Sequence, residues 1–356
     1  MNERLLDELV SSIQPVERSL EKTVLSRLDN LTKPKGSLGR LEDFALRYCL
    51  ITGKSYPGDL KKAVLVFAGD HGITEEGVSA FPKDVTYQMV KNFLNGGAGI
   101  NVLARHVGAD VKVIDIGVDH DLTGIDGLLH KKVARGTKNM AKGPAMTREE
   151  AVEAILAGAE VAEEVIAQRK NILATGEMGI GNTTAASAIT AVICNMSPSE
   201  VTGRGTGIDW EAYEKKIKLI ERALEVNRPR RDDPLDCLSK VGGLEIAGIC
   251  GMILKACQKK VPVVVDGFIS GAGAVVARAL SPLVSDYIFC GHSSVEKGHK
   301  IQMEYLGHEP ILDLNMRLGE GTGAVLAMGL IEAGVKIYKE MATFDQAAVS
   351  PGNEAI

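Results

Sequence analysis

Short apolar runs that end in glycine and polar residues alternate with long helical segments along most of this chain. Six such runs occupy residues 63–68, 111–116, 171–175, 261–265, 287–290 and 310–314. The segments between them, such as residues 148–169, 183–196 and 210–227, have the length of helices. Strands buried on both faces read as continuous apolar runs, and strands that alternate with helices indicate βα units. The sequence therefore predicts an α/β protein whose parallel sheet is covered by helices on both faces.

Polar residues follow at least five of these six runs. The run 63–68 leads to the sequence GDHG at residues 69–72, and the run 287–290 leads to GHSS at residues 291–294. In open α/β sheets, ligands bind beyond the carboxyl ends of the strands. The pattern therefore indicates a small-molecule site at this edge of the sheet, and not a scaffold.

Size and charge narrow the possible classes of protein. The chain has 356 residues, more than a typical single core, so one large domain and a smaller one are expected. The net charge of −5 is mild, and no stripe of lysine or arginine suggests nucleic acid. Residues 1–55 read mainly as helices. The apolar stretch 241–257 contains Glu245 and several glycines, which favours a buried helix over a membrane span.

The cysteines and the first residues indicate a cytoplasmic protein. The six cysteines form no CxxC pair, and most lie in apolar surroundings, which fits a reducing compartment. The first eight residues are charged and amphipathic, unlike a signal peptide. No metal is expected, because neither the Asp70-His71 pair nor His292 has a second histidine at the spacing of metal ligands.

The most informative polar segment is LGEGTGA at residues 318–324, where one carboxylate, Glu320, lies between Gly319 and Gly321. Glycine allows a positive φ and lets the backbone come close to a ligand. An apolar helix is expected to follow directly, over residues 324–331. The segment predicts a carboxylate that reaches a ligand; the alternative is a tight turn with a solvated glutamate.

A second glycine-rich segment, GEMGIGNTT at residues 176–184, follows a strand and opens a helix. Backbone N–H groups and the helix N-terminus can hold an anion at such a place. The spacing is similar to that of a phosphate loop, but Asn182 stands where a nucleoside triphosphate would need lysine. The segment therefore favours a single phosphate and argues against an NTPase; the alternative is a plain strand-to-helix turn.

The sequence GRGTGID at residues 203–209 offers a second contact to phosphate or ribose, through Gly205. No clear strand precedes it, which disfavours a dinucleotide-binding fingerprint. Lys215 and Lys216 open the next helix, and either could reach the same anion. The alternative for both lysines is a solvated helix face.

One segment early in the chain supplies the parts of a pocket for an aromatic ring. Phe81 offers a stacking surface and Met89 adaptable apolar packing, while Ser79 or Gln88 could hydrogen-bond a ring nitrogen. Asp84 is expected to cap the helix that carries Gln88 and Met89.

Asp266 ends an apolar strand in the sequence VDG. It could orient a substrate or stabilise developing positive charge, or it could cap the turn that follows. The sequence leaves both roles open.

Together these motifs resemble the nicotinate-nucleotide–dimethylbenzimidazole phosphoribosyltransferase family. The matching runs are KPKGSLG at 33–39, AGDHG at 68–72, GEMGIGNTT at 176–184, VVDG at 264–267 and RLGEGTGA at 317–324. They follow one another in order over nearly the whole chain.

The resemblance implies a Rossmann-like fold with a parallel six-stranded sheet, helices on both faces and a small helical domain. The large α/β domain is expected over residues 59–308. Residues 1–58 are expected to form the first part of the small domain. Residues 309–356 are expected to hold the last strand and the catalytic loop, and then the C-terminal helices that complete the small domain.

The resemblance also implies an activity. The family transfers phosphoribose from β-nicotinate mononucleotide to 5,6-dimethylbenzimidazole, and gives nicotinate and α-ribazole 5′-phosphate with inversion at C1′. It acts as a homodimer without a metal or organic cofactor. The general base of the family corresponds to Glu320, and Glu177 is expected to be a supporting carboxylate near the base ring.

Two groups of residues are expected to bind the substrates, with Ser293 as the alternative to Ser294. The base pocket is expected to contain Ser79, Phe81, Gln88, Met89, Met178 and Leu318. The phosphate and ribose are expected to contact Gly179, Ile180, Gly181, Asn182, Thr183, Gly205, Lys216, Asp266, Ser294, Gly319 and Gly321.

Two other kinds of function remain as alternatives. A regulatory protein on the same fold could hold a mononucleotide without turnover. A phosphatase-like or kinase-like hydrolase is disfavoured, because the Walker lysine and clusters of metal ligands are missing. The sequence also leaves open which base is preferred, since one methyl group changes binding by only about 1–3 kcal/mol.

Overall fold

A parallel sheet forms the centre of the molecule, which we describe from a computed structural model. The structure describes residues 2–205, 207 and 209–350, and within them the sheet has six strands in the order β3-β2-β1-β4-β5-β6. Every neighbouring pair is parallel, as predicted. The strands are β1 (Lys62–Gly69), β2 (Ala109–Gly117), β3 (Leu128–His130), β4 (Ile172–Met178), β5 (Val263–Val265) and β6 (Ile288–Cys290).

The strand order reverses between β1 and β4. The chain first builds outward from β1 through β2 to β3, and then returns to the other side of β1 with β4. At such a reversal the loops after two adjacent strands diverge and leave a crevice. The loops that follow β1 and β4 therefore border the expected site.

One predicted strand does not form, and one observed strand was not predicted. Residues 310–314 form no strand. They run beside the end of β6, where Leu312 makes one parallel bridge with His292 and the Ile311 N–H donates a 2.8 Å hydrogen bond to the Cys290 carbonyl oxygen. The sixth strand is β3 at the opposite edge, where burial falls from Leu128 to an exposed His130. A half-exposed edge strand of three residues has no continuous apolar run, so its pattern does not stand out in the sequence.

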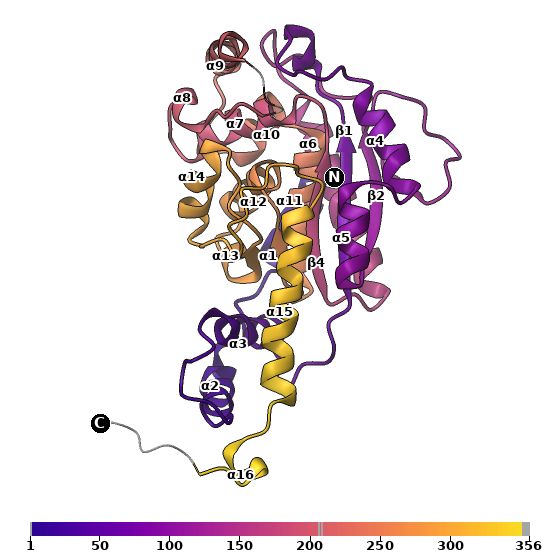
Figure 1. Cartoon of the computed structure of the whole chain (residues 1–356). Helices are drawn as coiled ribbons and strands as arrows, with labels where there is room; N and C mark the ends of the chain where they lie inside the picture. The colour runs from indigo at the N-terminus through magenta and orange to yellow at the C-terminus, as the bar shows by residue number, and fades with distance from the viewer. Residues whose placement is uncertain (1, 206, 208, 351–356) are drawn as a thin grey trace.

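Helices cover both faces of the sheet, as predicted (Figure 1). On one face, α11 (Leu244–Gln258) packs on β1, β2 and β4 and against α6 (Arg148–Ala167) and α12 (Phe268–Leu280). On the other face, α5 (Gly99–Val107) lies on β2, and α15 (Thr322–Glu340) lies on β4 and β5. The apolar α11 is buried along nearly its whole length, and no described helix is long and apolar enough to cross a bilayer.

A smaller helical part lies beyond the sheet, around the far end of α15 (Figure 1). Here α2 (Glu21–Asp29) and α3 (Arg40–Thr52) meet Tyr338 of α15 in a second apolar core. Segments from both chain ends thus build one cluster, as the resemblance implies. In contrast, α1 (Asn2–Ser11) packs on α6 and α11. The domain boundaries at residues 58 and 308 stay predictions.

The remaining helices connect these layers. They are η1 (Arg18–Leu20), η2 (Gly72–Glu76), α4 (Val85–Leu94), α7 (Asn182–Ile193), α8 (Pro198–Val201), α9 (Trp210–Asn227), α10 (Pro234–Val241), α13 (Val284–Tyr287), α14 (Lys297–Leu306) and α16 (Phe344–Ala347). The expected helix after Asp84 begins there, but the Asp84 side chain makes no capping hydrogen bond.

Candidate active site

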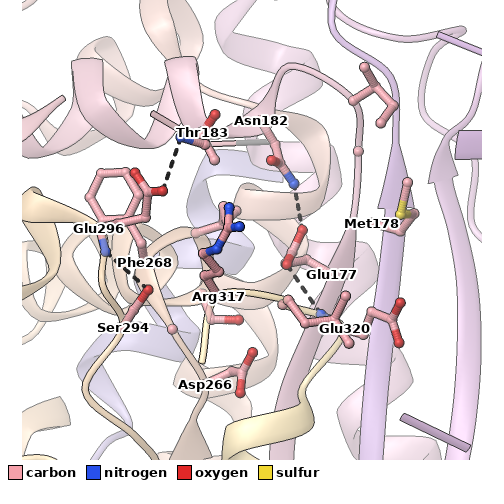
Figure 2. A pocket seen from close by; sticks show the side chains of 18 of the residues that line it. Glu177, Met178, Asn182, Thr183, Asp266, Phe268, Ser294, Glu296, Arg317 and Glu320 are labelled. Carbon is pink, nitrogen blue, oxygen red and sulfur yellow. Dashed lines mark hydrogen bonds between the residues drawn. The ribbon is translucent and has the colours of Figure 1, made fainter. Parts of the chain in front are cut away.

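A cavity of about 600 Å³ opens at the carboxyl ends of β4 and β5, beside the start of α15 (Figure 2). Its wall joins segments that lie far apart in the sequence, from residue 81 to residue 320. Fourteen of the residues expected at the site line it: Phe81, Met89, Glu177, Met178, Gly179, Ile180, Asn182, Thr183, Gly205, Asp266, Ser294, Leu318, Gly319 and Glu320. The two glycine-rich segments therefore face one cavity.

Five expected site residues do not line this cavity. Ser79 accepts a hydrogen bond from the Phe81 backbone N–H (3.1 Å), and Gln88 is exposed on α4. Gly181 and Gly321 are the N-cap residues of α7 and α15, each with a positive φ. Lys216 lies just behind the wall.

Glu320 is a buried carboxylate, which excludes the alternative of a solvated turn. It is 6% exposed and adopts a φ of 63°, in the left-handed region. Its Oε2 accepts a 3.1 Å hydrogen bond from the backbone N–H of Ile100, in the first turn of α5. Burial raises the pKa of Glu320, although the Ile100 N–H opposes this by favouring the charged form. The carboxylate is therefore oriented and is easier to protonate than an exposed glutamate.

Glu177 is the second-last residue of β4 and lies next to this loop. Its Oε1 accepts a 3.4 Å hydrogen bond from the Glu320 backbone N–H, and its Oε2 accepts a 2.5 Å bond from the Asn182 side chain (Figure 2). Burial, with smaller contributions from Asp266 and Glu245, raises the pKa of Glu177 to about 8. At neutral pH this carboxyl group is therefore mostly protonated, and it can donate a hydrogen bond to a ligand.

The glycines around Glu320 have a packing reason within the protein itself. A β-carbon added to Gly319 would overlap Glu177 Oε1, and Gly319 has a φ of 83°. A β-carbon added to Gly176 would lie 2.5 Å from the Glu320 carbonyl oxygen. The strand end and the Glu320 loop thus pack backbone against backbone, and the expectation that these glycines also let a ligand approach stays a prediction.

Asp266 caps a helix and also lines the cavity. Its Oδ1 accepts a 2.8 Å hydrogen bond from Ala324 N–H, and its Oδ2 accepts a 3.2 Å bond from Gly321 N–H. It therefore caps α15, and not the turn that follows it in the sequence. The same side chain lines the cavity, and burial raises the pKa of Asp266.

The opposite end of the cavity carries a buried cation. Lys216 on α9 is 1% exposed, and its Nζ donates a 2.8 Å hydrogen bond to Thr183 Oγ1. Burial lowers the pKa of Lys216 to about 8. Lys215 is exposed, so Lys216 is the lysine of the pair that lies beside Thr183. Ser294 lines the cavity and Ser293 does not.

Several lining residues were missed in the sequence. Glu296 precedes α14, and its Oε1 accepts a 3.0 Å hydrogen bond from Gly205 N–H. Arg317 projects into the cavity (Figure 2). The sequence did contain a signal for Arg317, because this arginine belongs to the RLGEGTGA run and arginine is a common anion ligand. Nothing in the sequence links Glu296 to residue 205. The other missed lining residues are Val85, Gly267, Phe268, Ile269 and Ser270.

The two histidines at strand ends have carboxylate partners. His71 Nε2 lies 2.7 Å from Glu245 Oε1 in a fully buried pair. His292 lines the cavity, with its Nε2 3.8 Å from Asp266 Oδ1. Among the described residues, no group of three or more His, Cys, Asp or Glu is placed to hold a metal ion.

The cavity thus has buried carboxylates at one end, and a lysine lies behind its glycine-rich wall at the other end. Apolar side chains line the space between the two ends. A family model described as a phosphoribosyltransferase matches residues 13–349, which assigns the chain to this class of enzyme. The crystal structure of CobT from Thermus thermophilus is similar, with a TM-score of 0.91 and 47% identity over 94% of this chain and 100% of that one.

Relatives with curated names identify the family within this class of enzyme. A protein from Geobacter metallireducens, named nicotinate-nucleotide–dimethylbenzimidazole phosphoribosyltransferase, is 61% identical over 98% of this chain and 99% of its own length. Proteins of the same name are 58% identical in Geobacter sulfurreducens, over 98% of this chain and 99% of the relative, and 56% identical in Chlorobaculum parvum, over 98% of each. The chain belongs to the nicotinate-nucleotide–dimethylbenzimidazole phosphoribosyltransferase family.

Proposed function

We propose that this enzyme transfers phosphoribose from β-nicotinate mononucleotide to 5,6-dimethylbenzimidazole, giving nicotinate and α-ribazole 5′-phosphate with inversion at C1′. The observation that carries the proposal is the two-ended cavity, with Glu320 and Glu177 at one end and Thr183 and Lys216 at the other. The names of relatives that match over nearly their whole length support the choice of substrates.

Glu320 is the proposed general base. An azole nitrogen that attacks C1′ must lose its N–H proton, and a carboxylate within hydrogen-bond reach can accept it. General-base catalysis of this kind contributes roughly 10²–10⁴-fold to the rate. The raised pKa of Glu320, which follows from its burial, brings the carboxylate closer to the working pH and supports this role.

Glu177 has a different proposed part. Because its pKa of about 8 leaves it mostly neutral at pH 7, it serves better as a hydrogen-bond donor than as a second negative charge. We place it next to the azole ring, where it orients the base relative to Glu320. The Asn182 and Glu320 contacts that hold Glu177 support this positioning role.

The leaving group requires little assistance. Nicotinate is bound through a cationic ring nitrogen and departs neutral at that nitrogen, so no general acid is obligatory. The sugar gains oxocarbenium character, which the charged form of Asp266 or Glu320 would stabilise. Both side chains line the cavity, which supports this proposal.

The phosphate provides binding energy remote from the reacting carbon. We propose that residues 179–183, Gly205, Ser294 and Lys216 bind it, with Gly319 and Gly321 near the ribose. Remote binding energy can hold the planar base in line with C1′, and proximity of this kind lowers the barrier. The contact between Lys216 and Thr183 supports a shared anion site.

The aromatic base fits the apolar side of the cavity. Phe81 and Leu318 line it although they are 53% and 59% exposed, and Met89 and Met178 complete this wall. Large apolar side chains that remain exposed at a cavity mouth favour a planar ligand that covers them. Ser79 and Gln88 keep a place in the proposal only through the resemblance, since neither lines the cavity.

The decisive experiment mixes the purified enzyme with nicotinate mononucleotide and dimethylbenzimidazole. We expect nicotinate release that depends on the base, and a product of the mass and α-configuration of α-ribazole 5′-phosphate. Binding of the mononucleotide without nicotinate release would instead favour a regulatory protein. Competition among benzimidazole, dimethylbenzimidazole, adenine and phenol, read out by product mass, would identify the preferred base.

The homodimer and the cytoplasmic location also stay proposals. The homodimer rests on the family resemblance, and sedimentation of the purified protein at several concentrations would test it. A monomer at every concentration would contradict it. Fractionation of cells that express the protein would test the location.

A further inference from the structure

A buried carboxylate lies at the end of the cavity where phosphate is proposed to bind. Glu296 is 9% exposed and lines the cavity wall. Its Oε1 accepts the Gly205 N–H, while its Oε2 is buried without a hydrogen-bond partner among the described residues. Oε2 packs under the same loop, since a β-carbon added to Gly203 would overlap it. A negative charge here opposes a phosphate, so its presence needs a reason.

Two cations face Glu296 from different elements. Lys216 comes from α9, and its Nζ would lie 3.3 Å from a β-carbon added to Gly205, the residue whose N–H Glu296 binds. Arg317 comes from the loop before Glu320 and projects into the cavity (Figure 2). Both cations favour the charged form of Glu296.

Other ionisable groups nearby complete the electrostatic surroundings. Lys297 follows Glu296 directly and donates a 3.0 Å hydrogen bond to Tyr213 OH on α9. His299, on the first turn of α14, has its pKa lowered to about 3 by burial and therefore stays neutral. His292 lies near Asp266 on the other side of Ser294. None of these groups adds a second negative charge next to Glu296.

We propose that Glu296 is a positioning residue that acts as the counter-ion of Lys216 and Arg317 in the free enzyme and takes up a proton when the phosphate binds. The inference rests on the proposed phosphate end of the cavity. With Glu296 ionised, two cations face one anion. A phosphate dianion would leave the group with a net charge of −1, and protonation of Glu296 would bring it to zero. Glu296 and Lys216 are buried, whereas Arg317 is exposed. An uncompensated charge beside buried groups is costly, so the proton goes to the Glu296 carboxylate.

The surroundings of Glu296 already favour proton uptake. Burial raises the pKa of this carboxyl group, and Lys216 and Arg317 only partly oppose that shift. Once a bound anion satisfies the two cations, their effect on Glu296 weakens and the carboxylate binds its proton more tightly. The proton attaches to an oxygen of Glu296, and no bond of the phosphate is made or broken.

The proposed proton uptake determines the direction in which the affinity for a dianion changes with pH. Since the complex holds one more proton than the free enzyme, the affinity for a dianion must fall as the pH rises. The fall is at most about tenfold per pH unit for one coupled proton. Glu296→Gln keeps an oxygen that can accept the Gly205 N–H but removes the charge, so it should bind dianions more tightly and lose this pH dependence.

Inorganic sulfate is the probe of choice, because it does not titrate between pH 5.5 and 9. Calorimetry in two buffers of different ionisation enthalpy gives both the sulfate affinity and the number of protons taken up. At pH 7 we expect an uptake approaching one proton in the wild type and near zero in Glu296→Gln, with sulfate at least about tenfold tighter in the variant. Above pH 8 the sulfate affinity of both proteins should fall together, because Lys216 loses its proton.

Controls separate charge from structure. Glu304→Gln changes an exposed glutamate on α14, the helix that follows Glu296, outside the cavity wall, and should match the wild type. Glu296→Asp keeps the charge and should keep the proton uptake, even where the contact with Gly205 weakens. Thermal melting of each variant checks folding.

Three results would overturn the inference: no sulfate binding at all, no proton uptake in the wild type, or unchanged or weaker sulfate affinity in folded Glu296→Gln. The experiment is independent of turnover. Linked proton uptake in a protein that releases no nicotinate would remove the proposed function and leave this inference in place. Normal turnover without linked proton uptake would overturn this inference and leave the proposed function in place.

Discussion

The side-chain amide of Asn182 donates a 2.5 Å hydrogen bond to Glu177 Oε2, across the turn from β4 to α7. Asn182 stands where a phosphate loop would carry lysine, and it was expected to contact phosphate. In this structure its side chain fixes a carboxyl group whose other oxygen accepts the Glu320 backbone N–H, and its contact with phosphate stays a prediction. The phosphate-type loop and the carboxylate loop are therefore one connected unit.

Glu320→Gln should lower kcat at least about tenfold, because the amide cannot accept the azole proton. Nicotinate mononucleotide should still bind within about threefold of the wild-type affinity, since the side chain keeps its size and can still accept the Ile100 N–H. Steady-state kinetics and calorimetric titration measure the two quantities. Asp313→Asn, in the same loop but exposed and outside the cavity wall, is the control. Turnover near the wild-type rate in Glu320→Gln would remove Glu320 from the role of base.

Asn182→Ala should weaken the mononucleotide roughly tenfold, as expected for the loss of one or two polar contacts at the site. It should also move the pKa of Glu177 further up, because the lost hydrogen bond favours the charged form. Calorimetry gives the affinity, and the pH profile of kcat gives the shift. Unchanged affinity together with a shifted profile would assign Asn182 to Glu177 alone and remove it from the phosphate site.

Gly319→Ala should abolish most activity, because the added methyl group would overlap the Glu177 carboxyl group. Gly307→Ala is a matched control: Gly307 also has a positive φ, of 75°, but a β-carbon there meets nothing within 4 Å. Both variants should lose about 1 kcal/mol of stability from backbone strain. Only the first should lose turnover. Equal activities in the two proteins would show that Gly319 is present for its conformation and not for the contact.

Glu177→Gln should flatten the pH dependence of stability. Burial raises the pKa of Glu177 to about 8 from an ordinary value of 4.5, so the folded chain holds this proton more tightly than the unfolded chain. Its contribution to stability is complete below about pH 4.5 and is lost as the pH rises toward 8. Between pH 5 and 8, the change in the free energy of unfolding should differ between the wild type and Glu177→Gln by on the order of a few kcal/mol. Denaturant titrations at both pH values test this, with Glu304→Gln as control; parallel curves for wild type and Glu177→Gln would contradict it.

Much of the architecture is readable from the sequence because its signals are local. Five of the six apolar runs are strands, and the segment at residues 210–227 is the helix α9. Burial on both faces removes polar residues from a central strand, and this leaves a mark in the sequence itself. The run at residues 310–314 has the same composition, yet it pairs through one bridge only. Residues 310–312 are half-buried and residues 313–314 are exposed, so an apolar composition by itself guarantees neither burial nor pairing with the sheet.

The sequence by itself determined the class of fold, the strand-end loops that meet at the site, and Glu320 as a carboxylate that lines the cavity, because glycine spacing and apolar runs are properties of neighbouring residues. Only the tertiary structure decided that Lys216 and not Lys215 faces Thr183, that Asn182 binds Glu177, and that Glu296 reaches Gly205. The physical reason is that hydrogen bonds and buried charges depend on distances in space. Glu296 and Gly205 are 91 positions apart in the chain, and the packing of α8 against both α9 and α14 brings them together.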